Sequence, residues 1–230
     1  MLLNYPLRDD AWDRAFIAGF ADALAAHDAR LIGGDTVSLP PGAPRVLTLT
    51  ALGSDARAPA RSGARNGDTL WVTGTIGDGG AGLAIARGEP GPAALLDAYR
   101  RPQPRLAEGR ALPPHVHAMM DVSDGLLIDA ARMATASDVA VSIDLAAVPL
   151  SGDYRTHIGE DRAARLAAAT AGDDYQLLFA APPGFAPPVA ATAVGRFATG
   201  RGITLTWGKT PLPLPEKLGF EHACAPLGDR

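Results

Sequence analysis

Two carboxylates stand three residues apart in the stretch DVSDGL, residues 121–126. A helical pattern follows over residues 126–136, so Ser123 or Asp124 is well placed as its N-cap. The start of that helix would add free N–H groups and a partial positive charge. Mg²⁺ is commonly bound by one or two carboxylates together with phosphate oxygens. The stretch therefore indicates either metal–phosphate chemistry or a simple capped helix with acidic residues in its first turn.

Two further acidic motifs lie on either side of this one. Residues 30–32 predict a short strand that ends in GGDT, residues 33–36, where glycines would let the backbone approach a ligand closely. Taken alone, that motif is better explained by an ordinary tight turn. Residues 172–179 read GDDYQLLF, in which Asp173 and Asp174 precede an apolar strand. Neighbouring like charges are costly unless they are solvated, paired or metal-bound, so this is either a site or a solvent-facing turn.

The composition limits the class of protein. The chain has 230 residues, of which 47% are hydrophobic, and its net charge is −4. That balance argues against nucleic-acid binding by a basic face. Cys224 is the only cysteine, which excludes an internal disulfide and a cysteine-based zinc site. No run reaches 18 apolar residues and no signal-peptide pattern is visible, so we expect a cytoplasmic protein with no membrane partner.

The elements that must position these motifs follow from periodicity. Helices are predicted over residues 10–29, 81–87, 93–100, 105–111, 126–136 and 160–169. Strands are predicted over residues 46–52, 69–73, 115–120, 139–144, 189–195 and 203–207, in addition to the two above. The pattern over residues 46–52 has the composition of a buried strand. Asp9 or Asp10 would cap the helix over residues 10–29. A change to Ala, Arg, Gly and Pro over residues 54–67 predicts a boundary between residues 1–53 and 54–230.

Three other motifs are better explained by structure than by chemistry. Residues 77–82, GDGGAG, match a dinucleotide fingerprint, but no strand–helix–strand unit closes after them, so the glycines indicate tight helix–strand packing. Residues 208–210, GKT, lack the earlier glycine of a phosphate-binding loop, and Pro211 forbids the helix that should follow. His115 and His117 lack a third metal ligand. Arg61, taken alone, is a solvated loop cation rather than a phosphate clamp.

Read together and in order, the three acidic motifs resemble those of the thiamine-monophosphate kinase family. Further similar stretches are residues 61–64, 72–78, 101–105 and 136–138, and the resemblance covers nearly the whole chain. It implies an α+β protein with the two-domain fold of aminoimidazole ribonucleotide synthetase. Residues 1–53 would be the rear of a ferredoxin-like domain that binds ATP and metal, and 54–230 the second, α+β domain.

The resemblance also implies a reaction and a site. ATP would phosphorylate thiamine monophosphate to thiamine diphosphate with the help of Mg²⁺. No catalytic residue is expected, because the attacking phosphate oxygen is already an anion and needs no protein base. By position, the metal ligands would be Asp35, Asp121 and Asp124, and the ATP contacts Gly34, Asp35, Arg61 and Ser123. Asp173 and Phe220 would border thiamine monophosphate.

Two departures from the family shape the expectations. The family has Glu where this chain has Asp173. The family also has a front portion with further metal-binding acids, which nothing between Met1 and Asp35 supplies, so we expect a fragment that is inactive alone. The whole protein would be a homodimer that pairs through its first domain. The alternatives are another ATP-using synthetase of the superfamily, of the purine-biosynthesis type, and an inactive fragment that retains the fold.

Overall fold

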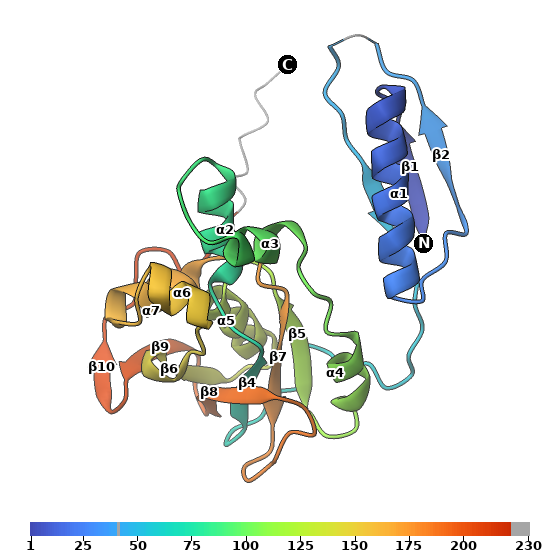
Figure 1. The fold of residues 1–230 in the computed structure, drawn as a ribbon. Coiled ribbons are helices and arrows are strands. Elements are labelled where there is room, and N and C mark those ends of the chain that lie inside the picture. Colours follow the sequence, from blue (N-terminus) through green and yellow to red (C-terminus); the bar gives the residue numbers. More distant parts are fainter. Residues whose placement is uncertain (41, 222–230) are drawn as a thin grey trace, which may run out of the picture. The chain divides into compact units, whose positions relative to one another are not determined.

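The computed structural model describes residues 1–40 and 42–221, so Cys224 lies outside the described part of the chain. The chain divides into two units, Met1–Ala56 and Arg57–Arg230 (Figure 1). The change of composition over residues 54–67 spans this division. That the first unit is the rear of an ATP- and metal-binding domain stays a prediction. Within the described residues, no helix is both long and apolar enough to span a membrane.

The first unit is a three-stranded sheet with one helix. Its elements are β1 Leu2–Pro6, α1 Asp10–Ala26, β2 Gly33–Val37 and β3 Thr48–Thr50, with strand order β2-β1-β3. β1 runs parallel to β2 and antiparallel to β3. The Asp9 carboxylate accepts a hydrogen bond from the Trp12 N–H at 2.9 Å, so Asp9 is the N-cap of α1.

Two strand predictions in this unit are wrong. β2 begins at Gly33 rather than at residue 30, so the GGDT motif lies within a strand instead of following one. Gly34 has a φ of 151°, and a Cβ there would lie 1.9 Å from the Leu3 carbonyl oxygen, so β1 can pair this closely only with glycine. β3 covers only three residues, all of them exposed, and lies at an edge of the sheet. The alternating pattern of residues 46–52 thus does not mark a buried strand within this unit.

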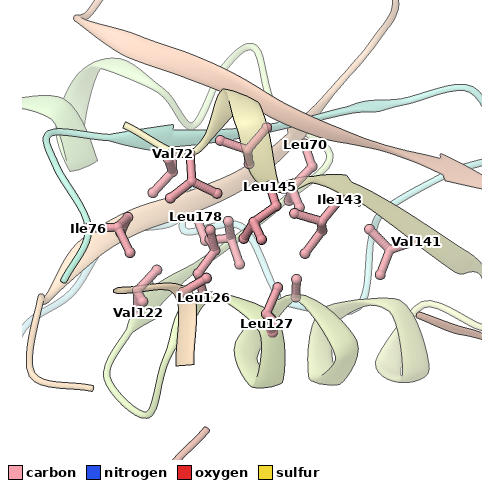
Figure 2. Close-up of a cluster of buried hydrophobic side chains, with 14 of the residues drawn as sticks. Leu70, Val72, Ile76, Val122, Leu126, Leu127, Val141, Ile143, Leu145 and Leu178 are labelled. Atoms are coloured by element: carbon pink, nitrogen blue, oxygen red, sulfur yellow. The ribbon is translucent and has the colours of Figure 1, made fainter. Parts of the chain in front are cut away.

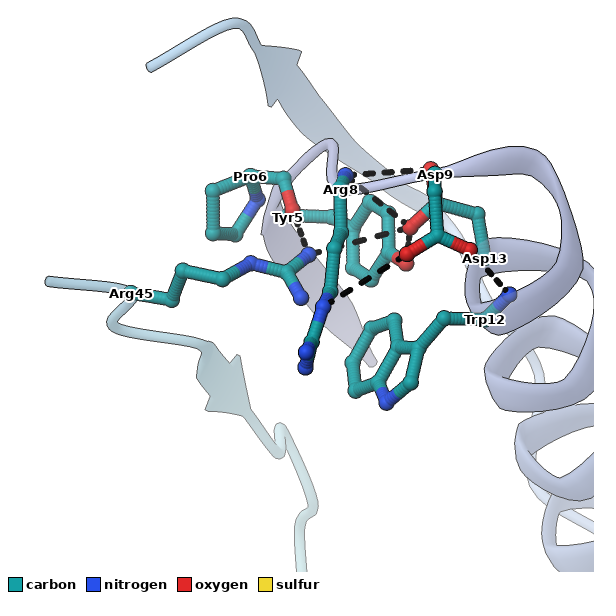
Figure 3. A network of polar contacts seen from close by, with 7 residues as sticks. All are labelled: Tyr5, Pro6, Arg8, Asp9, Trp12, Asp13 and Arg45. Carbon is teal, nitrogen blue, oxygen red and sulfur yellow. Dashed lines mark hydrogen bonds and ion pairs between the residues drawn. The ribbon is translucent and has the colours of Figure 1, made fainter. Parts of the chain in front are cut away.

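Arg45 joins the β3 side of the unit to the start of α1 (Figure 3). Its guanidinium lies over the Trp12 ring, 4.3 Å from the ring centroid, and donates a hydrogen bond to the Pro6 carbonyl. It also lies 3.7 Å from a carboxylate oxygen of Asp13, which accepts a hydrogen bond from the Tyr5 hydroxyl. A largely buried cation over an indole stabilises a fold by about 1–2 kcal/mol.

Arg45→Ala is therefore expected to lower the free energy of unfolding of the first unit by about 1–2 kcal/mol, through loss of the cation–π contact. Chemical denaturation followed by far-UV circular dichroism measures the change. Arg14→Ala is the matched control, because the Arg14 side chain is 82% exposed and forms a single ion pair among the described residues, to Asp10 at 4.0 Å. An equal loss of stability in both variants would contradict the role given to Arg45.

The second unit contains a mixed seven-stranded sheet, in the order β10-β9-β6-β8-β4-β7-β5. Only β6 and β9 pair in parallel. The strands are β4 Thr69–Thr73, β5 Ala118–Val122, β6 Ala140–Asp144, β7 Gln176–Ala181, β8 Ala191–Ala198, β9 Gly202–Trp207 and β10 Thr210–Leu212. The helices are α2 Asp78–Ala86, α3 Ala93–Arg100, α4 Leu106–Ala111, α5 Leu126–Ala136, α6 Gly152–His157 and α7 Arg162–Thr170, with a short 3₁₀ turn at Leu145–Ala147.

The main core lies between α5 and this sheet (Figure 2). α5 contacts β5, β6, β7 and β9. Leu126, Ala130 and Met133 recur at helical spacing on its buried face, and all three are fully buried. Leu178 and Ile143 meet this face from β7 and β6. Because α5 is fixed by this burial, the loop that leads into it from β5 is fixed as well.

Two elements of the second unit escaped the sequence analysis. The first is α6, which is capped by Ser151, whose hydroxyl accepts from the Tyr154 N–H at 3.0 Å. The second is β10, which contains Pro211 and for which no strand was predicted. Proline is tolerated there because β10 is an edge strand and pairs only with β9. β5 also begins at Ala118 rather than at residue 115.

Candidate active site

The loop after β5 and the loop before β7 lie side by side. β5 and β7 are antiparallel neighbours, with Val122 opposite Gln176, so the end of one strand meets the start of the other. The Asp173 N–H donates to the Ser123 carbonyl at 2.9 Å, and the Tyr175 N–H donates to the Val122 carbonyl at 2.8 Å. Two of the three acidic motifs are thereby joined by main-chain hydrogen bonds.

These loops form one wall of a pocket of about 800 Å³. Four predicted site residues line it, namely Ser123, Asp124, Asp173 and Phe220. The remaining lining residues are Gly80, Leu83, Arg87, Tyr99, Thr170, Ala171, Gly172, Tyr175 and Gly219. Carboxylates and aromatic rings thus face the same space, which suits a ligand with both charged and aromatic parts.

The Tyr175 hydroxyl donates to one carboxylate and is influenced by the negative charge of two others. Burial, a hydrogen bond to Asp173 and the negative charge of that carboxylate raise the Tyr175 pKa, and the charges of Asp121 and Asp124 raise it further. The hydroxyl lies 3.0 Å from the Asp173 carboxylate and donates to it. Asp124 and Asp173 thus line the pocket together, whereas Asp121, an exposed residue of β5, is not among the lining residues.

The cap of α5 differs from the prediction. The N-cap residue is Gly125, with a φ of 128°, and neither Ser123 nor Asp124 caps the helix through its side chain. The Asp129 carboxylate instead accepts the N–H groups of Ser123 and Asp124, each at 3.0 Å. A carboxylate within the helix therefore accepts the N–H groups of the loop that precedes the helix. Ser123 and Asp124 both line the pocket, and the Asp124 carboxylate is also held by Arg132.

Sequence reasoning missed Asp129 and Arg132, which support this loop. Asp129 is fully buried, and burial raises its pKa despite the hydrogen bonds that it accepts. Arg132 donates to the carboxylates of both Asp124 and Asp129. The signal that could have revealed the pair is their spacing of three residues on one helical face. Arg132 therefore fixes Asp124 while balancing the buried charge of Asp129.

Asp174 is not in a solvent-facing turn, which excludes that interpretation of the third motif. Its carboxylate is buried and accepts the N–H of Gly77 at 2.8 Å and of Gly79 at 3.1 Å, at the start of α2. Burial raises its pKa to about 7, against the lowering effect of these two bonds. The positive end of α2 helps to keep the ionised form in place.

The glycines of residues 77–82 act differently from the prediction of helix–strand contact. A Cβ at Gly79 would lie 2.4 Å from the Asp173 carbonyl oxygen, and one at Gly82 would lie 2.1 Å from that of Leu95. Gly79 therefore lets the loop before β7 lie close to α2, and Gly82 lets α3 lie close to α2. The sequence analysis predicted that no strand–helix–strand unit closes after these glycines. The structure agrees, because α2 is followed by two helices, α3 and α4.

The C-terminal part of the described chain completes the pocket wall. The Phe220 N–H donates to the Asp124 carbonyl at 2.8 Å. A Cβ at Gly219 would lie 2.4 Å from the same oxygen and equally close to the Ile128 side chain. Phe220 is held beside the loop of Asp124 although almost a hundred residues separate them in sequence.

The remaining predicted residues lie elsewhere. Arg61 lines a separate hollow of about 490 Å³, which it shares with Arg132 and one face of α5. Gly34 and Asp35 belong to the first unit, where the Asp35 carboxylate accepts the Thr36 N–H at 2.9 Å. Their place in a shared site stays a prediction. His117 lies 2.9 Å from Asp68, which agrees with a structural role.

The donor set fits Mg²⁺ that is shared with phosphates better than a closed protein site. Over residues 1–40 and 42–221, no group of three or more His, Cys, Asp or Glu side chains is arranged to hold a metal ion. Asp121 and Asp124 flank the end of β5 and offer two carboxylates. Mg²⁺ typically takes one or two protein carboxylates and completes its octahedron with water and substrate phosphates.

Comparison with known proteins defines the class first. Residues 65–207 match the sequence profile described as AIR synthase related protein, C-terminal domain. That stretch holds the sheet, α5 and both acidic loops of the pocket. The fold and this match place the second unit in the AIR synthase-related class.

More specific relatives are thiamine-monophosphate kinases. The kinase of Caulobacter vibrioides is 36% identical over 96% of this chain and 67% of its own length. That of Escherichia coli K12 is 38% identical over 79% of this chain and 57% of its own length. A solved structure described as AaThiL complexed with AMPPCP and TMP has a TM-score of 0.77 at 28% identity and covers 91% of this chain and 71% of that one. The chain belongs to the thiamine-monophosphate kinase family, and it spans 57% to 67% of the length of these two curated relatives.

Proposed function

We propose that the whole protein transfers a phosphoryl group from ATP to thiamine monophosphate and so forms thiamine diphosphate. One observation carries the proposal: a single pocket brings together Ser123, Asp124, Asp173 and Phe220. These are the residues for which the family resemblance implies substrate, nucleotide or metal contacts. The relative whose structure contains AMPPCP and TMP supports the same pair of ligands.

The residues divide into two groups by chemistry. Asp121 and Asp124 would hold Mg²⁺, which when bound neutralises phosphate charge and aligns the phosphates. Asp173 would face the positively charged organic part of thiamine monophosphate, and Phe220 would lie against its rings. The positions of Asp124, Asp173 and Phe220 at the pocket support these roles, while Asp121 lies outside the pocket lining, at the end of β5.

The nucleotide would be bound on the other side of the Asp124 loop. Arg61 and Arg132 line the same hollow, and Arg132 also contacts Asp124. Two guanidinium groups suit the phosphates of ATP. Ser123 would reach ATP from the pocket side of this loop, and contacts of Gly34 and Asp35 with ATP stay predictions from the family resemblance. We also propose that the whole protein acts as a homodimer, in agreement with the resemblance.

No protein base is required in this scheme. The nucleophile is an oxygen of a phosphate that is already ionised at neutral pH. The protein must align two anionic substrates and neutralise the charge between them. Carboxylates that bind Mg²⁺, together with arginines, supply that function.

The test is direct product analysis with the whole protein. Incubation with ATP, Mg²⁺ and thiamine monophosphate should yield equimolar thiamine diphosphate and ADP, separated by liquid chromatography. Turnover of aminoimidazole precursors with none of thiamine monophosphate would move the assignment to the purine-biosynthesis class. No turnover of either substrate would favour a fold that is retained without activity.

A further inference from the structure

The loop before β7 holds two non-glycine residues in the left-handed region. Asp173 has a φ of 68° and Tyr175 a φ of 49°, and they flank Asp174. Such residues cost about 1 kcal/mol or more each and persist only where the surroundings enforce them. Strain of this kind is concentrated at functional sites. We therefore expect the side-chain directions that this backbone imposes to serve a function.

Hydrogen bonds on both sides enforce this backbone. The N–H groups of Asp173 and Tyr175 are bound to the carbonyls of Ser123 and Val122. Between them, the Asp174 carboxylate is buried against the start of α2 through Gly77 and Gly79. Asp174 thus anchors the loop inward, while its two neighbours both line the pocket.

The two outward residues are coupled to each other. The Tyr175 hydroxyl donates to the Asp173 carboxylate at 3.0 Å. This is the one side-chain hydrogen bond of the Asp173 carboxylate within residues 1–40 and 42–221. Tyr175 is 40% exposed, so its ring contributes little to the core and its hydroxyl acts mainly on Asp173.

We propose that Tyr175 is a positioning residue: through its hydroxyl it holds the Asp173 carboxylate toward the organic, cationic part of thiamine monophosphate. This inference rests on the proposed function of the pocket. A carboxylate that rotates freely must be ordered when substrate binds, whereas one held by a hydrogen bond is already oriented. Tyr175 should therefore affect the KM for thiamine monophosphate more than kcat.

The experiment is a double-mutant cycle in the whole protein with Tyr175→Phe, Asp173→Asn and both changes together. Tyr175→Phe should raise the KM for thiamine monophosphate about 3–10-fold, the effect of one hydrogen bond to a charged, partly exposed group. The KM for ATP and the melting temperature should stay within error of wild type. In the Asp173→Asn background, Tyr175→Phe should have no further effect, because it acts through the carboxylate.

Asp153→Asn is the control for removing a carboxylate, since Asp153 is exposed in the first turn of α6. An unchanged KM in Tyr175→Phe, or effects that multiply in the double variant, would overturn the positioning role. Wild-type protein that does not phosphorylate thiamine monophosphate would instead overturn the proposed function, and this inference with it. The two failures are therefore distinguished by the wild-type assay alone.

Discussion

Asp124→Asn in the whole protein is expected to lower kcat by about 10²–10³, the usual cost of losing one electrostatic element in an active site. Asn keeps the size of the side chain but removes the charge that would hold Mg²⁺. Asp121→Asn should act in the same way, because Asp121 would be the second carboxylate of the proposed Mg²⁺ site at the end of β5. The measurement is steady-state turnover over a range of Mg²⁺ concentrations.

Asp129→Asn provides the contrast, because it makes the same chemical change five residues away. Asp129 is fully buried and accepts two backbone N–H groups and one from Arg132, so its loss should cost about 3–5 kcal/mol of folding free energy. The Asp124 side chain is 20% exposed, and Arg132 keeps its ion pair with Asp129 when the charge on Asp124 is removed. The Asp124 variant should therefore fold normally. Near-normal turnover at every Mg²⁺ concentration would reduce Asp124 to a structural partner of Arg132.

Asp174→Asn is expected to remove a large pH dependence of stability. Burial raises the Asp174 pKa from 3.8 to about 7, with the charges of Asp78 and Asp173 adding to the effect. A carboxyl group whose pKa is raised in the folded state stabilises the fold fully below about pH 4 and loses that contribution as the pH rises through 7. A shift of this size corresponds to at most about 4 kcal/mol.

The free energy of unfolding of wild type, minus that of Asp174→Asn, should therefore fall between pH 4 and pH 8. Urea denaturation at several pH values measures this difference and cancels the contributions of other carboxylates. Asp153→Asn, at an exposed position, should run parallel to wild type. A difference that rises with pH would show that the Gly77 and Gly79 bonds and the α2 dipole outweigh the burial of the charge.

The strongly periodic elements could be predicted from the sequence. The bounds of β4, α3 and α5 agree with the structure to the residue, because each has a clear apolar pattern between Gly, Pro or Asp boundaries. The acidic motifs were also recognisable as a set. The membership of the kinase family and the α+β fold are confirmed by the comparisons and the structure.

What could not be predicted depends on contacts between distant residues. The proximity of the Asp124 and Asp173 loops follows from the pairing of β5 with β7, which local periodicity does not encode. The buried state of Asp174 depends on the N–H groups of a helix almost a hundred residues earlier. The capping role of Asp129 was hidden because Ser123 and Asp124 offered a simpler local solution. The metal and substrate roles of the predicted residues stay predictions.

The hydrogen bond from Phe220 to the Asp124 carbonyl has a practical consequence for handling the protein. Residues that look like a dispensable trailing end form part of the pocket wall, so an affinity tag fused close behind Phe220 would crowd the site. Trimming the chain before Gly219 to improve crystallisation would remove that wall altogether. Surface immobilisation is better placed at an exposed residue outside the pocket lining, such as Asp153 on α6.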